Sequence, residues 1–435
     1  MYGLVLARRR NSLRLLLKAC VSFLVAWLVA GSAAGAGADG SKIDWTKDFK
    51  RARILGIRDD KLVVAYVMGK ECPGCRVMEE QVFTSPVVEK ALEPTIPVWV
   101  EYEPGSVFVK DYKIVFTPTV IILSGGDPVV KFDGVVRPEE FAEVVRAAKG
   151  LAAEYAKAEA EAAAHPDDPT LEAKALVLRV RNGVGEWVES QILNCMKKLA
   201  DSNEPKAQIA RIELSSELAS EALDEQVYQL AAYAANDGLD AVARLKPEEL
   251  DKVDWRQVEH LFRVAMAVDA QARRQAMVRK RARECEEFLE ARLKKDPDDV
   301  ELARRLAWIY SIDDKSGEAA KTLAAAWAKG PDKFRDPDGA LVELAGYEDA
   351  AGDKEAALKH LGALIESYPK SPYVLSAYYG GVRILMELER PDEARKWYEA
   401  LVKKAPQSDE AKGAARLLEG GKAGETPESE TREGA

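Results

Sequence analysis

The chain has 435 residues, 47% of them hydrophobic, which is enough for two or three domains that each bury a core of their own. Its formal net charge of −10 at pH 7 argues against a nucleic-acid partner, because no basic face is evident to neutralise phosphates. Five cysteines are too few for a chain of this length to depend on disulfides for its fold.

Residues 1–38 have the three parts of a secretory signal peptide. Basic residues occur from Arg8 to Lys18, an uncharged apolar run covers residues 19–30, and Ala36-Gly37-Ala38 fits the small-residue cleavage rule. The apolar run is shorter than the roughly 20 residues that a membrane-spanning helix needs. We therefore expect export to the periplasm or another extracytoplasmic compartment. A membrane anchor formed by an uncleaved N-terminal segment is the alternative.

Cys72 and Cys75 form a Cys-x-x-Cys pair between an apolar strand and a helix. Residues 62–67 predict a buried strand, and residues 76–92 predict a helix. The start of a helix carries partial positive charge and unpaired N–H groups, which favour a thiolate over a thiol. A thiolate at Cys72 attacks a disulfide, and a second cysteine one turn away resolves the product. The pair is therefore predicted to be the catalytic couple of a thiol–disulfide oxidoreductase.

Two other interpretations of the cysteine pair remain open. Tetrahedral zinc needs four ligands, but residues 42–150 contain no third cysteine and no histidine. A passive structural disulfide is also possible, although such a short loop constrains the unfolded chain little. The strand before the pair and the helix after it favour redox chemistry. We expect no bound metal and no cofactor.

The segments after the cysteines predict the rest of an α/β domain. Residues 96–102 and 116–123 predict strands, residues 124–127 a hairpin turn, residues 129–132 a returning strand and residues 138–148 a closing helix. This order of strands and helices indicates a mixed sheet with flanking helices.

Across residues 42–150 this order resembles the thioredoxin superfamily. Residues 80–88 are similar to the segment after the cysteines in exported thioredoxin-like proteins related to the electron-transducing disulfide reductases. The resemblance implies a thioredoxin-like fold that acts on protein thiols and disulfides. It also implies that Pro118 follows a cis peptide bond and faces the cysteines. Thr117 and Pro118 would then form the substrate groove, with the Thr117 backbone pairing with an extended peptide.

Two features depart from the thioredoxin pattern. That pattern has Trp before the first cysteine and Gly-Pro between the two, where this chain has Lys70-Glu71 and Pro73-Gly74. Tyr66 occupies the position of a buried acid that thioredoxins use as a proton acceptor. The departures leave the fold prediction unchanged. They leave the redox direction open among reductase, oxidase and isomerase, because the reduction potential sets that direction.

Beyond Gly150 the composition changes, and no further strand is predicted. We assign residues 151–419 to an all-α domain and residues 420–435 to a polar, disordered tail. Breaks containing proline recur in the all-α domain with spacings of 34, 38 and 37 residues, at Pro297, Pro331, Pro369 and Pro406. A period of this size predicts a solenoid of helix-turn-helix repeats.

The segments before the last three breaks share small and large apolar residues at matching positions. They resemble tetratricopeptide repeats in three good copies, with a partial copy at residues 284–297, although Glu348 stands where a large apolar residue is usual. Repeat boundaries within residues 170–280 are not predicted. Stacked repeats form a curved surface suited to a protein partner, and the alternative is a scaffold or dimerisation element.

Cys195 and Cys285 lie among these predicted helices. Three states stay open for them: a disulfide with each other, buried inert thiols, or a relay of electrons from Cys72.

The sequence therefore predicts an exported, thioredoxin-like enzyme that exchanges disulfides with proteins, with helical repeats for partner binding. The alternative is a repeat scaffold whose thioredoxin-like domain is a docking or redox-sensing module.

Overall fold

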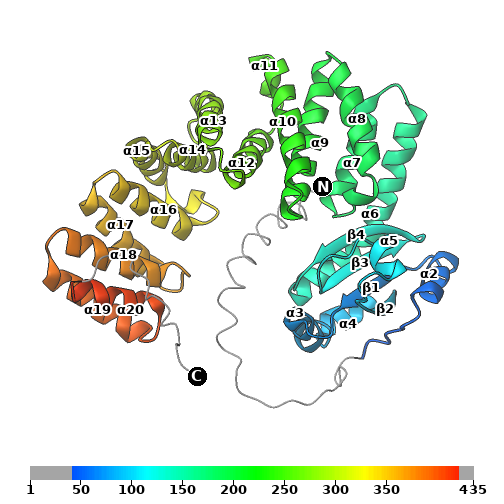
Figure 1. Ribbon diagram of the computed structural model, residues 1–435, viewed down its shortest axis with the longest axis horizontal. Coiled ribbons are helices and arrows are strands. Elements are labelled where there is room, and N and C mark those ends of the chain that lie inside the picture. Colours follow the sequence, from blue (N-terminus) through cyan, green and yellow to red (C-terminus); the bar gives the residue numbers. More distant parts are fainter. Residues whose placement is uncertain (1–41, 421–435) are drawn as a thin grey trace, which may run out of the picture. The chain divides into compact units, whose positions relative to one another are not determined.

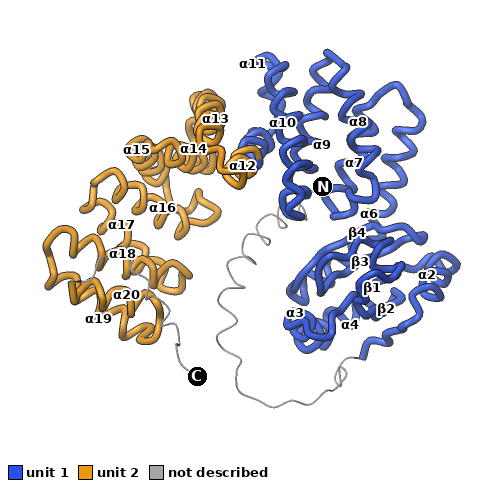
Figure 2. The backbone as a smooth tube through the Cα atoms, viewed as in Figure 1, with its two compact units in different colours: residues 1–264 blue, residues 265–435 orange. Residues whose placement is uncertain are grey.

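The computed structural model describes residues 42–420 and divides into two compact units, residues 1–264 and 265–435 (Figure 2). The predicted signal peptide lies outside the described residues, and so does the predicted tail except for Gly420. Export and the membrane-anchored alternative therefore stay predictions. Within residues 42–420, no helix combines the length and the apolar character needed to cross a bilayer.

A four-stranded mixed sheet in the order β2-β1-β3-β4 forms the start of the first unit (Figure 1). β1 (Val63–Met68) pairs in parallel with β2 (Ile96–Glu101) and antiparallel with β3 (Thr119–Ser124). β4 (Asp127–Asp133) returns antiparallel beside β3. The sequence predicts that this strand starts at residue 116, whereas β3 starts at Thr119. The strand starts later because Pro118 has no N–H to donate to the strand ladder.

Helices cover both faces of the sheet (Figure 1). These helices are α2 (Phe49–Arg58), α4 (Pro86–Leu92), α5 (Val107–Asp111) and α6 (Pro138–Ala164). Successive residues of β1 point to opposite faces, so Val64 and Tyr66 join one apolar cluster and Val63 and Ala65 join another. α4 and α6 contribute to the first cluster, and α2 and α5 contribute to the second.

The helix predicted over residues 76–92 is interrupted. The structure has α3 (Pro73–Val77), a π-helical turn η1 (Met78–Val82) and, after a break, α4. The break follows from Pro86, which has no N–H to continue a helix and holds Ser85 in an extended conformation with ψ of 128°. A π-helical turn within a helix often accompanies a functional site.

The predicted domain boundary at residue 150 falls inside α6. Leu151 and Tyr155, in the second half of this helix, are buried in the same cluster as the sheet residues. The composition changes at residue 150 because no strands follow it, but α6 continues to pack on the core of the sheet beyond this residue. The first unit therefore also contains a set of helices: α7 (Pro169–Arg181), α8 (Glu189–Asp201), α9 (Pro205–Asp224), α10 (Tyr228–Arg244) and α11 (Pro247–Leu250). The division between the units lies within α12 (Trp255–Gln271).

Polar contacts attach the segment between α7 and α8 to β4, the edge strand of the sheet. Lys131 of β4 extends its Nζ to within 2.6 Å of Glu186 Oε1, in the short turn η2 (Gly185–Trp187). The side chains of this pair are only 7% and 12% exposed. The backbone N–H of Lys131 donates to the Asn182 carbonyl at 3.1 Å, which covers part of the β4 edge.

Within residues 265–420 of the second unit, the regular structure is helical, and the helices pack as consecutive antiparallel pairs (Figure 1). They are α13 (Gln275–Lys295), α14 (Val300–Ile312), α15 (Ser316–Trp327), α16 (Pro337–Ala350), α17 (Lys354–Ser367), α18 (Val374–Glu387), α19 (Pro391–Lys404) and α20 (Asp409–Leu418), with a 3₁₀ turn η3 at Pro331–Lys333. All four predicted proline breaks lie between helices. Arg383 pairs with Asp349, and Arg390 pairs with Glu355, so equivalent helices of adjacent repeats are linked by ion pairs.

Glu348, the residue that departs from the repeat pattern, is buried but has a polar partner within its own repeat. It is 6% exposed, and its Oε2 lies 2.7 Å from His360 Nδ1 in the partner helix of the same repeat. A buried carboxyl group needs such a partner, so the polar pair replaces an apolar contact without disrupting the helical hairpin.

Cys195 in α8 and Cys285 in α13 are both buried thiols. The Cys195 Sγ donates to the Pro169 carbonyl at 3.4 Å. Burial raises the pKa of Cys195 to about 12, so the reactive thiolate is scarce near neutral pH. Of the three predicted states, the structure shows the buried thiol.

Candidate active site

Cys72 and Cys75 are joined by a disulfide at the start of α3. The chain leaves β1 at Met68 and reaches Cys72, which is the N-cap residue of α3. Pro73 follows at the first helical position, where its missing N–H and fixed φ fit without loss. The N–H of Cys75 lies 3.1 Å from Cys72 Sγ, so a backbone donor is aimed at that sulfur. Such a donor stabilises a thiolate when the disulfide opens.

The two cysteines differ in exposure. Cys75 is 1% exposed and belongs to the apolar cluster on its face of the sheet, whereas Cys72 is half-buried. Cys72 is therefore the more exposed residue of the pair, and Cys75 is covered by the protein. This difference in exposure fits the predicted roles, in which Cys72 forms the mixed disulfide with a substrate and Cys75 resolves it.

The Thr117–Pro118 peptide bond is cis, which confirms that part of the prediction. Two glycines show how closely this peptide approaches the cysteine loop. A Cβ atom added to Gly74 would lie 3.1 Å from Pro118 Cδ, and one added to Gly69 would lie 2.9 Å from Thr117 Oγ1. The structure therefore brings together all four predicted site residues, Cys72, Cys75, Thr117 and Pro118, and their roles stay predictions.

Hydrogen bonds hold the loop before β3 in place. The Pro118 carbonyl accepts from the Gly134 N–H at 2.7 Å, and Thr119 Oγ1 donates to the Phe116 carbonyl at 2.8 Å. Pro118 itself is buried and Thr117 is half-buried. Within residues 42–420, the Thr117 backbone forms no hydrogen bond with another backbone group, so its N–H and C=O stay available to a bound peptide.

Tyr66 and Glu79 form a polar pair next to Cys75. The Tyr66 hydroxyl, on a residue with 0% exposure, lies 3.2 Å from both the Cys75 carbonyl oxygen and Glu79 Oε1. Burial is the main reason that the pKa of Tyr66 is raised far above its usual range. Burial also raises the pKa of Glu79, and the Tyr66 hydrogen bond only partly opposes this effect.

Sequence reasoning missed Glu79. The position of the usual buried acid is occupied by Tyr66, but a carboxyl group reaches the same neighbourhood from η1, four residues after Cys75. Residues four apart lie on one face of a helix, so the spacing from Cys75 was the available signal.

The charged residues around the cysteine loop are engaged elsewhere or exposed. Lys70 Nζ lies 2.9 Å from Glu101 Oε1, and both side chains face solvent. Glu71 and Arg76 are exposed as well. Pairs of this kind interact weakly because water screens them, so they contribute little to the chemistry of the sulfur atoms.

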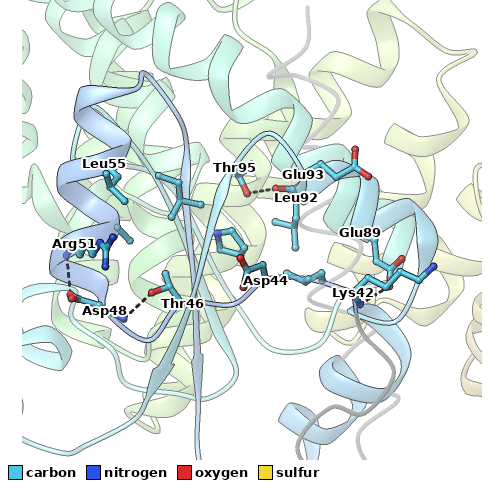
Figure 3. Close-up of a pocket in the computed structure, with 14 residues that line it drawn as sticks. Lys42, Asp44, Thr46, Asp48, Arg51, Leu55, Glu89, Leu92, Glu93 and Thr95 are labelled. Atoms are coloured by element: carbon cyan, nitrogen blue, oxygen red, sulfur yellow. Dashed lines mark hydrogen bonds between the residues drawn. The ribbon is translucent and has the colours of Figure 1, made fainter.

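A cavity of about 500 Å³ lies in the same domain but away from the cysteines (Figure 3). It is lined by the segment from Lys42, by α2, by the end of α4 and by Ile96 and Pro97 at the start of β2. β1 and β2 are parallel, and Cys72 follows the end of β1, so the cavity and the disulfide lie at opposite ends of these strands. None of the predicted site residues lines it.

Within the described part of the chain, no group of three or more His, Cys, Asp or Glu side chains is arranged to hold a metal ion.

Comparisons with known proteins agree with this architecture. Residues 49–149 match the thioredoxin-like domain family, and residues 350–418 match the tetratricopeptide repeat family. No curated protein sequence matches the chain. The chain is thus a thioredoxin-like α/β domain followed by an all-α solenoid that resembles tetratricopeptide repeats.

Several solved structures also resemble parts of the chain. A thioredoxin from Thermus thermophilus shares 24% identity over 23% of this chain and 83% of its own, with a TM-score of 0.22. The MamA protein shares 16% identity over 45% of this chain and 93% of its own, with a TM-score of 0.34. The apo form of RapI shares 10% identity over 64% of this chain and 75% of its own, with a TM-score of 0.39.

Proposed function

We propose that Cys72 and Cys75 form a redox couple that exchanges disulfides with protein substrates in an extracytoplasmic compartment. The observation that carries the proposal is the joint placement of a half-buried Cys72, a buried Cys75 and the cis Thr117–Pro118 peptide around one surface. The match of residues 49–149 to the thioredoxin-like domain family supports the same chemistry.

Exchange proceeds through a mixed disulfide on Cys72. When a substrate dithiol is oxidised, its first thiolate attacks Cys72 Sγ, and the bond to Cys75 breaks with the electron pair leaving on Cys75. The second substrate thiolate then attacks the substrate sulfur of the mixed disulfide and releases Cys72. Two electrons and two protons pass from the substrate to the couple. In the reverse direction, reduced Cys72 attacks a substrate disulfide and Cys75 resolves the product.

The surroundings of the sulfurs support each part of this cycle. The N–H of Cys75 aimed at Cys72 Sγ stabilises the negative charge that appears on that sulfur. The open backbone of Thr117 offers a strand-like edge to an extended substrate beside the disulfide.

The helical repeats of the second unit are proposed to bind a protein partner or client. Their support is the match of residues 350–418 to the tetratricopeptide repeat family, since stacked repeats present an extended surface that a single helical hairpin lacks. The N-terminal pattern of residues 1–38 supports export, and sequencing the N-terminus of the mature protein tests it.

Reduction of insulin by dithiothreitol tests the enzyme proposal. The chain should accelerate the reaction, and Cys72→Ser should abolish the acceleration. Cys195→Ala is the matched control, because it removes a buried thiol outside the site and should leave the rate unchanged. Equal rates with and without the Cys72 sulfur would overturn the proposal and favour the scaffold alternative, in which the repeats carry the function.

A further inference from the structure

The outer face of α2 combines exposed isoleucines with basic side chains. Ile54 and Ile57 are 66% and 54% exposed, whereas Ala52 and Gly56 on the opposite side are buried. At 100° per residue, Ile54 and Ile57 lie in the middle of the exposed face. Lys50 lies between them, Arg51 and Arg58 flank them on one side, and Arg53 flanks them on the other, where its Nε donates to the Gly126 carbonyl at 3.2 Å. An apolar centre with cations at both margins is the pattern of a helix that lies on a lipid surface.

The charge of this region differs from that of the whole chain. Residues 47–61 contain six Lys or Arg and three Asp, whereas the full chain has a formal charge of −10. Within this segment Asp59 pairs with Arg58 on the outer face of α2, and Asp60 pairs with Lys149. Charges act over only about 8 Å at physiological ionic strength, so an anionic surface close to α2 senses the local excess of basic residues.

We propose that the α2 face, defined by Lys50, Arg51, Arg53, Ile54, Ile57 and Arg58, docks on an anionic lipid bilayer. The two isoleucines insert at the level of the acyl chain boundary, and the longer basic side chains reach the lipid phosphates. An acidic protein partner would satisfy the same charges, but it gives no reason for exposed isoleucines between the cations. This inference does not depend on the redox proposal.

Docking through this face leaves the disulfide accessible. α2 packs on the face of the sheet that carries Ala52, Val63 and Ala65, whereas Cys75 belongs to the cluster on the other face. A bilayer that contacts α2 therefore lies across the sheet from the redox couple, and protein substrates can still reach Cys72.

Vesicle co-sedimentation tests the inference with the chain from Asp39 to Ala435, which retains every described residue. We expect binding to vesicles of phosphatidylcholine with 30% phosphatidylglycerol, weaker binding to pure phosphatidylcholine, and loss of binding at 0.5 M NaCl. The double variant Arg53→Gln/Arg58→Gln should weaken the partition coefficient about 25-fold, because each basic residue near an anionic surface contributes about a factor of five. Ile54→Ser/Ile57→Ser should weaken it several-fold.

The matched control is Val107→Ser/Val115→Ser, which removes two side chains that are 73% and 70% exposed but lie outside the α2 face. This variant should bind as the parent does, and circular dichroism should show that all variants are folded. Absence of parental binding at millimolar anionic lipid would overturn the inference. So would unchanged binding of Ile54→Ser/Ile57→Ser, which would indicate a purely electrostatic surface for acidic macromolecules. Concentration-dependent dimerisation abolished by that variant, without lipid binding, would assign the face to a second copy of the chain instead.

Discussion

The Tyr66 hydroxyl lies 3.2 Å from Glu79 Oε1 and an equal 3.2 Å from the Cys75 carbonyl oxygen. A tyrosine on a central strand thus connects a carboxyl group to the backbone of the buried cysteine. Tyr66 also packs its ring against Phe83 and Trp99, with centroids 4.7 and 5.1 Å apart, so the hydroxyl is held in a fixed position. The carboxyl group that the sequence lacks at position 66 is therefore supplied from η1.

Glu79→Gln should change how stability depends on pH. Burial raises the pKa of Glu79 in the folded protein above its ordinary value of 4.5. The stabilising contribution of a raised carboxyl pKa is fully present below pH 4.5 and is lost as pH rises through the folded-state pKa. Glutamine has no such loss, so the stability of the variant relative to the parent should increase between pH 4 and pH 7. Urea unfolding at several pH values measures this difference, and a difference that falls with pH would contradict the assignment.

Tyr66→Phe should destabilise the domain while preserving the aromatic packing. The ring contacts remain, but the Cys75 carbonyl and the Glu79 carboxyl group lose a buried donor, which typically costs about 1 to 3 kcal/mol. Urea unfolding of Tyr66→Phe, Glu79→Ala and the double variant forms a cycle. Because the two side chains are in contact, the single effects should not add, and strict additivity would contradict the hydrogen bond.

Gly74→Ala should slow exchange with protein substrates. The added Cβ would meet Pro118 Cδ at 3.1 Å and Val135 Cγ2 at 3.3 Å, so the cysteine loop and the proline loop must move apart. Stopped-flow reduction of a protein disulfide should show a lower rate than the parent. Gly150→Ala is the control: its Cβ meets nothing within 4 Å in the middle of α6, and it should stabilise the protein by about 1 kcal/mol with no change in rate.

Cys195 should resist alkylation while the protein is folded. Its pKa of about 12 and its burial leave less than roughly one thiolate in a thousand at pH 8, and the covering helices block the reagent. After mild reduction, iodoacetamide followed by peptide mass mapping should label Cys72 within minutes and Cys195 only after denaturation. Rapid labelling of Cys195 in the native protein would contradict its buried state and reopen the electron-relay interpretation.

Patterns of short range allowed most of the fold to be predicted. Continuous apolar runs marked β1 and β3, which are buried on both faces, and the proline breaks marked the helical repeats, because both patterns depend on residues close in sequence. The domain boundary could not be predicted in the same way. Composition changes at Gly150, but Tyr155 beyond it donates a hydrogen bond to the Val129 carbonyl at 2.9 Å, and only the folded chain brings these residues together.

In the candidate site, too, features that depend on residues close in sequence could be predicted, and a contact between distant elements could not. Cys72 and Cys75 are evident from spacing, and Pro118 from a family resemblance. Glu79 joins the site only through the contact between the strand residue Tyr66 and the η1 turn. A buried polar contact between elements leaves little mark in the sequence, since either residue alone is common on a helix or a strand.

Glu186→Gln should destabilise the first unit strongly, because it leaves the Lys131 ammonium group buried at the edge of β4 without its charged partner. Their side chains are 7% and 12% exposed, and removing one member of such a pair typically costs about 3 to 5 kcal/mol. The hydrogen bond from Lys131 Nζ to the Lys113 carbonyl persists in the variant, which places the expected loss at the lower end of this range.

Asp60→Asn provides the matched control for that experiment. It breaks the Asp60–Lys149 pair, whose side chains are 83% and 63% exposed, and water hydrates the remaining ammonium group. Its cost should therefore stay below about 1 kcal/mol. Guanidinium unfolding followed by tryptophan fluorescence distinguishes the two variants, since Trp187 adjoins Glu186 and donates to the Asp111 carbonyl at 3.2 Å. Equal, small effects would mean that the helices after α6 are only loosely attached to the sheet. A selective loss in Glu186→Gln would show that the buried pair stabilises the junction between the thioredoxin-like domain and these helices.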